Sequence, residues 1–203
     1  MSAPGDYVFL DLPAEALDAP VVFLFHGTGG DETQFLDLAG HLLPGARRIG
    51  VRGDVSENGA LRYFRRFAEG QFDLDDLARA TRKMIGFIEA RIGPRRPAQV
   101  IGFGYSNGAN ILASVQFAAP ELFDTAILLH PMIPFEPAPQ PGLEGRRVLL
   151  TAGRRDPICP PAETERLIHW YGAQGADVTA FWHEGGHEIR QEELIAIRDY
   201  LRR

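Results

Sequence analysis

The sequence predicts an α/β protein in which helices cover both faces of a mostly parallel central sheet. Short apolar runs alternate with runs of helical periodicity along the 203 residues, which is the pattern of consecutive strand–helix units. The run at 21–25, VVFLF, is apolar without alternation, as expected of a parallel strand buried on both faces. The length fits a single domain over residues 1–203 and leaves no room for a large cap domain.

Strands are expected where apolar or β-branched runs are bounded by glycine, proline or charged residues. They cover residues 7–10, 21–25, 47–51, 98–103, 125–129, 147–151 and 177–182. We expect the first of them at an edge of the sheet. Residues 131–141 are rich in proline and predict an irregular loop that rims a pocket.

Helices are expected between these strands, over residues 31–43, 74–92, 109–118, 160–171 and 188–202. Asp31 is a candidate N-cap of the first helix. The second begins in a cluster of aspartates and ends near Arg91, as the helix dipole favours, and Gly93-Pro94 stops it. Pro160-Pro161 opens the fourth, because proline is tolerated in the first turn of a helix.

The composition argues against several classes of function. The formal net charge is −6 and the isoelectric point is near 5.5, which disfavours nucleic acid as a partner. No run approaches the ~18 apolar residues of a membrane span. The first residues lack the basic and apolar regions of a signal peptide, and a single cysteine leaves no intrachain disulfide. We therefore expect a cytoplasmic protein without a membrane span.

The most informative motif is the pentapeptide G-x-S-x-G at residues 104–108, between a predicted strand and a predicted helix. Its Ser106 stands at the apex of a sharp turn. A serine hydroxyl is a weak nucleophile that must stand clear of the backbone to meet a base and a substrate. The turn imposes strained dihedrals on the serine, and the two glycines let strand and helix pass without side-chain clashes.

Asp156 and His187 complete a candidate catalytic relay. Each follows a predicted strand, so both lie where a strand ends and a loop begins. An imidazole can take the Ser106 proton, while a carboxylate on its other nitrogen fixes the tautomer. The order Ser, Asp, His is that of the α/β-hydrolase fold, and ligands of such sheets bind beyond the carboxyl ends of the strands.

A glycine-rich loop, HGTGG at residues 26–30, is a candidate anion site. Such a loop can turn backbone N–H groups toward a developing oxyanion. The candidate donors are the backbone N–H groups of Thr28 and of Asn107, the residue after the serine. We expect His26 to brace this loop rather than to transfer protons.

Each of these features also has a purely structural interpretation. The two glycine motifs could be ordinary turns, Asp156 a turn residue before a proline, and His187 a solvated loop histidine. Their occurrence in this order, each at a predicted strand end, favours the catalytic interpretation. Three further histidines fall within helix or strand patterns and are interpreted as structural: His41, His130 and His169.

Two segments suggest other chemistries. Residues 183–187 spell H-E-x-x-H, the zinc-protease signature, which requires both histidines on one helical face. Two glycines inside it each cost a helix about 1 kcal/mol, the preceding residues predict a strand, and no convincing third ligand follows. We therefore expect neither a metal nor a cofactor. Cys159 is interpreted as a small apolar filler, because no histidine-pairing context surrounds it.

The segment 62–67, RYFRRF, mixes cations with aromatic rings. Such mixtures occur in nucleic-acid sites, but the acidic chain argues against a phosphate footprint. We expect the rings to line a pocket and the arginines to reach solvent or pair with acids. The expected pocket residues are Tyr63, Phe64, Phe67 and Met132.

The chain resembles the small α/β-hydrolases of the phospholipase/carboxylesterase group, which includes acyl-protein thioesterase-like and dienelactone-hydrolase-like enzymes, and it looks most like bacterial carboxylesterases. The resemblance covers nearly the whole chain and rests on residues 26–32, 52–53, 57–59, 64–66, 104–110, 156–157 and 186–188. It implies a catalytic triad of Ser106, Asp156 and His187, with oxyanion amides from Thr28 and Asn107. Members of the group often form homodimers, so a homodimer is a further expectation from the resemblance.

These observations predict a serine carboxylesterase that acts on small to medium, uncharged esters through an acyl-enzyme. Dienelactone hydrolases proper carry a cysteine nucleophile, and Ser106 in that place favours ordinary esters. Two alternatives stay open. One is an acyl-thioesterase or lysophospholipase with the same residues, and the other is a hydrolase-fold protein that binds a ligand without turnover.

Overall fold

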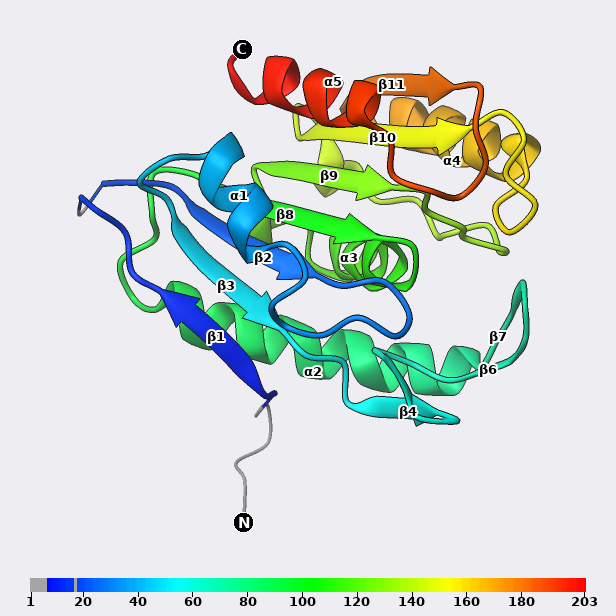
Figure 1. Ribbon diagram of the computed structural model, residues 1–203, viewed down its shortest axis with the longest axis horizontal. Coiled ribbons are helices and arrows are strands. Elements are labelled where there is room, and N and C mark those ends of the chain that lie inside the picture. Colours follow the sequence, from blue (N-terminus) through cyan, green and yellow to red (C-terminus); the bar gives the residue numbers. More distant parts are fainter. Residues whose placement is uncertain (1–6, 17) are drawn as a thin grey trace.

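A seven-stranded sheet with the order β1-β3-β2-β8-β9-β10-β11 forms the centre of the computed structural model, which describes residues 7–16 and 18–203 (Figure 1). Its strands are β1 Phe9–Leu12, β2 Val21–Phe25, β3 Arg47–Val51, β8 Val100–Tyr105, β9 Thr125–Leu129, β10 Arg147–Gly153 and β11 Asp177–His183. Neighbouring strands run parallel except β1, which pairs antiparallel with β3 at one edge. The mostly parallel sheet and the edge position of its first strand are confirmed. The first residues, on which the signal-peptide argument rests, lie outside the described ones.

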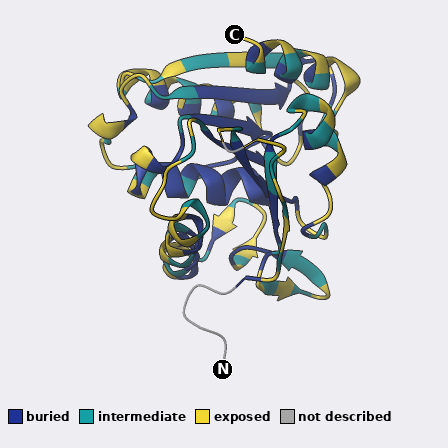
Figure 2. Ribbon diagram, turned by 90° about the vertical axis from the view of Figure 1, so that its left-hand side faces the viewer, coloured by how far each residue is buried: buried dark blue, intermediate teal, exposed yellow. Residues whose placement is uncertain are grey.

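Helices cover both faces of this sheet. They are α1 Leu36–Leu42, α2 Leu74–Ile92, α3 Asn107–Ala118, α4 Pro161–Ala173 and α5 Gln191–Leu201. Alternate side chains of β2 enter opposite layers: Phe23 and Phe25 pack in the core with α2, α3 and α4, and Val22 and Leu24 pack with α1 and α5. Because both layers are apolar, the strand reads as one continuous apolar run. Figure 2 shows the resulting buried interior, with exposed residues on the outer surfaces.

Helix boundaries follow the capping residues in one case and depart from the prediction in another. Asp73 caps α2 by accepting a hydrogen bond from the backbone N–H of Asp76 at 3.0 Å, and the helix has the predicted bounds. Asp31 does not cap α1. It accepts from the backbone and hydroxyl of Thr33 instead, and the helix begins only at Leu36. The intervening residues form turns, in which Gln34 accepts a hydrogen bond from the backbone of Gly27.

Residues 55–72 form two small hairpins that the sequence analysis treated as loop. They consist of β4 Val55–Glu57 with β5 Ala60–Arg62, and β6 Arg66–Ala68 with β7 Gln71–Phe72. Asn58 and Gly59 form the first turn with φ of +52° and +92°, values typical of an Asn-Gly hairpin. Within the described residues, these hairpins are the main addition near the carboxyl ends of the strands, and there is no large cap domain (Figure 1). No described helix is long and apolar enough to cross a membrane.

Candidate active site

Ser106 lies at the sharp turn between β8 and α3. Its φ of +53° and ψ of −118° place it outside the regions that side-chain-bearing residues readily adopt. A Cβ on Gly104 would lie 2.5 Å from the Gly108 carbonyl oxygen, and a Cβ on Gly108 would lie 2.2 Å from the Phe25 carbonyl oxygen. Only glycine fits at either position, so the predicted strain and the predicted roles of the two glycines are confirmed.

The structure brings Ser106, His187 and Asp156 together in one hydrogen-bonded relay. His187 Nε2 lies 2.9 Å from Ser106 Oγ, and His187 Nδ1 lies 2.6 Å from Asp156 Oδ2. Asp156 follows β10 and His187 follows β11, so both stand beyond the carboxyl ends of neighbouring parallel strands. With Nδ1–H donated to the carboxylate, Nε2 presents its lone pair to the serine hydroxyl.

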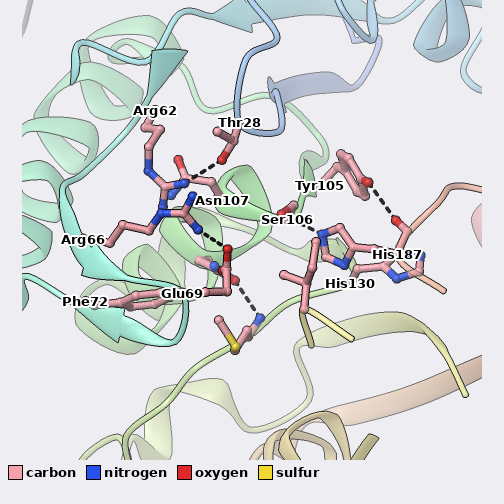
Figure 3. Close-up of a pocket in the computed structure, with 13 residues that line it drawn as sticks. Thr28, Arg62, Arg66, Glu69, Phe72, Tyr105, Ser106, Asn107, His130 and His187 are labelled. Atoms are coloured by element: carbon pink, nitrogen blue, oxygen red, sulfur yellow. Dashed lines mark hydrogen bonds and ion pairs between the residues drawn. The ribbon is translucent and has the colours of Figure 1, made fainter. Parts of the chain in front are cut away.

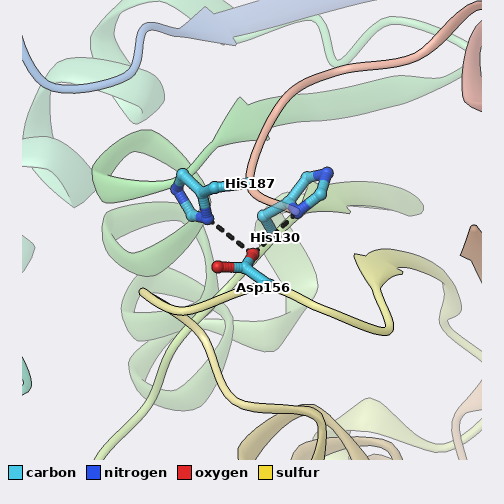
Figure 4. A group of neighbouring side chains, drawn as sticks. All are labelled: His130, Asp156 and His187. Atoms are coloured by element: carbon cyan, nitrogen blue, oxygen red, sulfur yellow. Dashed lines mark hydrogen bonds and ion pairs between the residues drawn. The ribbon is translucent and has the colours of Figure 1, made fainter. Parts of the chain in front are cut away.

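Asp156 is buried, and its two oxygens have separate tasks. Oδ1 accepts hydrogen bonds from the backbone N–H groups of Ile158 and Cys159 at 2.8 and 2.9 Å, as a turn residue would. Oδ2 faces the ring nitrogens of His187 and of His130, the latter at 3.1 Å (Figure 4). Burial opposes the charge of the carboxyl, but the hydrogen bonds from His130 and His187 outweigh it and lower the pKa of Asp156. The carboxylate is therefore ionised and held at both oxygens.

Tyr105 positions the loop that carries His187. Its hydroxyl donates to the backbone oxygen of His187 at 2.7 Å, and the two rings lie 5.4 Å apart (Figure 3). Burial raises the pKa of Tyr105 to about 12, so the hydroxyl stays a donor. A Cβ on Gly27 would lie 2.6 Å from this ring, so the glycine-rich loop also packs against it. This role of Tyr105 was not predicted, although the residue directly precedes the serine in the sequence.

The two candidate oxyanion donors face the same cavity as Ser106. In the described part of the chain, no acceptor pairs with the backbone N–H of Thr28 or of Asn107. Their side chains are anchored, because Arg62 donates to the Thr28 hydroxyl at 2.7 Å (Figure 3) and the Asn107 amide oxygen accepts from the Tyr63 backbone N–H at 2.8 Å. Both amides are thus held in place and free to donate.

His26 braces the glycine-rich loop. Its Nδ1 donates to the Gly27 carbonyl at 2.7 Å, and its Nε2 accepts from the Gly53 backbone N–H at 2.8 Å. Burial lowers the pKa of His26. The ring is therefore neutral, with both nitrogens engaged, which matches the expected bracing role.

A cavity of about 280 Å³ opens onto Ser106 and His187. Arg62, Arg66 and Glu69 form a polar wall on one side of it, across from Tyr105, His130 and His187 (Figure 3). The residues that line it beside the relay and oxyanion groups include Arg62, Arg66, Glu69, Phe72, Asn110, Met132 and Ile158. Arg66 pairs with Glu57 at 3.0 Å and with Glu69, and Arg62 lies 3.2 Å from Glu57. The polar wall is therefore charge-balanced.

The aromatic pocket lining expected from the sequence requires correction. Met132 lines the cavity, but Tyr63 and Phe64 are fully buried in the core and Phe67 is 77% exposed on the surface. The Tyr63 hydroxyl donates to the Val51 carbonyl at 2.7 Å, and the Phe64 ring packs against Phe72. The Tyr63 and Phe64 rings occupy apolar space under the hairpins, while Arg62 and Arg66 reach the cavity, where glutamates neutralise them.

No family model matches the chain. The curated "Putative hydrolase MhqD" of Bacillus subtilis (strain 168) is 40% identical over 184 residues, which are 90% of this chain and 92% of that protein. The crystal structure of the Bacillus cereus carboxylesterase is 35% identical with a TM-score of 0.89, covering 97% of this chain and 93% of the other. This chain belongs to the phospholipase/carboxylesterase family. The crystal structure of the protein Atu2452 of unknown function from Agrobacterium tumefaciens str. C58 is 50% identical with a TM-score of 0.91, covering 99% of this chain and 98% of that one.

These relatives identify the chain as a hydrolase of this family.

The H-E-x-x-H segment at residues 183–187 does not have the zinc-protease geometry, which requires both histidines on one helix. His183 ends β11, His187 lies in the following loop, and α5 begins only at Gln191. The carboxylate that approaches His183 is that of Glu193, at 3.1 Å, and it groups with His183 and His130 rather than with His187. The Gly185 backbone N–H donates to His183 Nδ1 at 2.9 Å, so Nε2 carries the proton that faces this carboxylate.

Cys159 of this α/β-hydrolase is expected to resist alkylation in the folded state. The thiol is buried, donates to the Pro131 carbonyl at 2.6 Å, and has its pKa raised by burial to about 12. Thiolate is the reactive form. Intact mass after treatment with iodoacetamide should show no adduct on native protein and one adduct in denaturant. Rapid modification of the native protein would contradict the apolar-filler interpretation.

Proposed function

We propose that this protein is a serine carboxylesterase that hydrolyses small to medium, uncharged carboxylic esters through an acyl-enzyme. The observation that carries the proposal is the relay from Ser106 through His187 to Asp156, with distances of 2.9 and 2.6 Å, opening into the cavity. A nucleophile within hydrogen-bond reach of a base that a third group orients is the arrangement of covalent acyl transfer.

In this mechanism Ser106 Oγ attacks the ester carbonyl carbon while His187 Nε2 takes the hydroxyl proton. The negative charge that develops on the carbonyl oxygen is stabilised by the backbone N–H groups of Thr28 and Asn107. The tetrahedral intermediate collapses as His187 returns its proton to the leaving alcohol. Water then attacks the acyl-enzyme by the same route, and Asp156 supports the imidazolium in both halves of the reaction.

The cavity supports the choice of substrate. Its volume of about 280 Å³ lies just below the ~300–1,000 Å³ typical of small-molecule sites. Its two arginines are paired with glutamates, so the wall carries little net charge to attract an acidic substrate. Both features favour short, uncharged esters. The carboxylesterase name of the Bacillus cereus neighbour supports the same class of reaction.

Activity is expected to be highest on short acyl chains. In a series of p-nitrophenyl esters from acetate to palmitate, kcat/KM should peak at a short chain and fall at least about tenfold toward palmitate, because atoms outside the cavity add no binding energy to the transition state. Acyl-thioesters of matched chain length serve as the comparison. Rates that rise through palmitate, or that favour thioesters, would support the lysophospholipase or thioesterase alternative instead.

Intact mass after mixing with a fluorophosphonate tests the nucleophile directly. One covalent adduct together with ester turnover is expected of a serine hydrolase. If the protein gives no adduct and no turnover, the alternative of a ligand-binding protein on this fold would be favoured.

A further inference from the structure

A second histidine, which is buried and which the mechanism above does not use, contacts the Asp156 carboxylate of the relay. His130 follows β9 and is fully buried. Its Nδ1 lies 3.1 Å from Asp156 Oδ2, the same oxygen that faces His187 (Figure 4). Its Nε2 lies 3.1 Å from Glu193 Oε1. The Asp156 and Glu193 side chains are also fully buried. The relay therefore continues from Asp156 through His130 to a second carboxylate on α5.

The geometry requires two donors on the His130 ring. A neutral imidazole has one N–H and one lone pair, whereas an imidazolium donates from both nitrogens. Both His130 nitrogens face carboxylate oxygens, which only accept while ionised. A neutral ring would point a lone pair at one of these oxygens, in a place without solvent to relieve the repulsion. The protonated ring satisfies both contacts.

The other titratable groups around His130 do not change the assignment of its ring as protonated. Nε2 of His183, on β11, lies 3.5 Å from Nε2 of His130. The backbone N–H of Gly185 holds His183 as the Nε2–H tautomer, which donates to Glu193 Oε2 at 3.1 Å. Tyr105 of β8 packs its neutral ring edgewise at 5.9 Å, and the His187 ring lies at 5.1 Å. Two carboxylates thus face one imidazolium, and the buried group keeps a net negative charge.

The electrostatic balance agrees with this geometry. Burial opposes the charge on His130, but hydrogen bonds to Asp156 and Glu193 outweigh it and raise the pKa of His130 to about 8. The backbone is also held, since the His130 N–H donates to the Thr151 carbonyl at 2.9 Å. Its φ of +49° lies in the left-handed region, a conformation that costs energy in a residue other than glycine.

We propose that His130 is a positioning residue of this site, which in its protonated form shares the Asp156 carboxylate with His187 and sets the pH at which His187 acts as a base. The inference rests on the proposed esterase function. A carboxylate next to an imidazole favours the protonated imidazole. The charge of His130 neutralises part of the Asp156 charge, so His187 loses its proton, and becomes an active base, at a lower pH than it would beside an unshared carboxylate.

The charge state of His130 can be tested on the wild-type protein without any assay of activity. Imidazole ¹⁵N NMR should show one buried histidine with both ring nitrogens protonated at neutral pH, assigned by its loss in His130→Asn. Asparagine is chosen because it tolerates the left-handed region better than most residues. A His130 signal typical of a neutral ring at neutral pH would overturn the proposal. This result does not depend on whether the protein is an esterase.

The effect of His130 on His187 as a base is tested by the pH profile of kcat/KM with p-nitrophenyl butyrate. The acidic limb of His130→Asn should move to higher pH by about 1 unit, because Asp156 then acts on His187 with its full charge. His169→Asn is the matched control, since His169 is exposed on α4, away from the relay, and its limb should not move. Lower activity at every pH with an unmoved limb would mean a merely structural role and would overturn the proposal.

Glu193→Gln provides a second variant if His130→Asn does not fold. The glutamine oxygen can still accept from the Arg190 backbone N–H, as Glu193 does at 2.8 Å, while the charge facing His130 Nε2 is removed. The second proton of His130 should then be lost at a lower pH than in wild type, as followed by ring ¹⁵N shifts. An unchanged titration of His130 in this variant would contradict the proposed double contact.

Discussion

Replacing Ser106 with alanine is expected to lower kcat for p-nitrophenyl butyrate by several orders of magnitude, on the order of 10⁴ to 10⁶-fold. The proposed mechanism has no other group to attack the carbonyl. In wild type, His187 Nε2 lies 2.9 Å from the serine hydroxyl, and in the variant it would have no hydroxyl proton to receive. The residual rate would come from the oxyanion amides and from binding alone. Because alanine keeps the Cβ and the backbone of the turn, the fold and the melting temperature should change little.

The measurement combines steady-state kinetics with intact mass after fluorophosphonate treatment. Wild type should carry one adduct and Ser106→Ala none. Ser114→Ala is the matched control, because Ser114 lies on the same helix α3 and its hydroxyl is 2.7 Å from that of Thr81, outside the cavity. It should retain both the adduct and wild-type turnover. Wild-type turnover by Ser106→Ala would mean that another residue is the nucleophile.

Replacing Asp156 with asparagine is expected to lower kcat by roughly 10⁴-fold. Asp156 uses both of its oxygens as acceptors, from two backbone N–H groups on one side and two imidazoles on the other. Asparagine has only one acceptor oxygen. If that oxygen stays with the backbone, the amide NH₂ faces His187 Nδ1 and favours the tautomer whose Nε2 cannot take the serine proton. The melting temperature should also fall, since His130 loses one of its two carboxylates.

A double variant makes this second prediction sharper. If Ser106 and Asp156 act as one unit, the double replacement Ser106→Ala with Asp156→Asn should be no slower than Ser106→Ala alone, because effects within such a unit do not add. The kinetics would be read together with thermal unfolding, so that a loss of fold is separated from a loss of mechanism. Fully additive losses would show that Asp156 acts outside the relay.

Elements with strong local patterns were predicted with the bounds that the structure has. Strands β2, β3 and β9 and helix α2 are of this kind, because an uninterrupted apolar run or a capped amphipathic helix needs little context. Helix α1 was predicted too long, since the loop that packs on Gly27 takes up the residues before it. The two hairpins at 55–72 were missed, although their Asn-Gly turn was a usable signal.

The sequence by itself determined the local architecture of the site: a serine on a turn that only glycines permit, and an acid and a histidine placed after successive strands. These features depend on residues that are neighbours in the sequence, so they can be predicted from the sequence. Only the tertiary structure decided that Arg62 and Arg66 line the cavity while Tyr63 and Phe64 enter the core. It also joined His130 to Asp156 and to Glu193, which lie 26 and 63 residues further along. Contacts of that range exist only when the parallel strands align their ends, and no local pattern encodes that alignment.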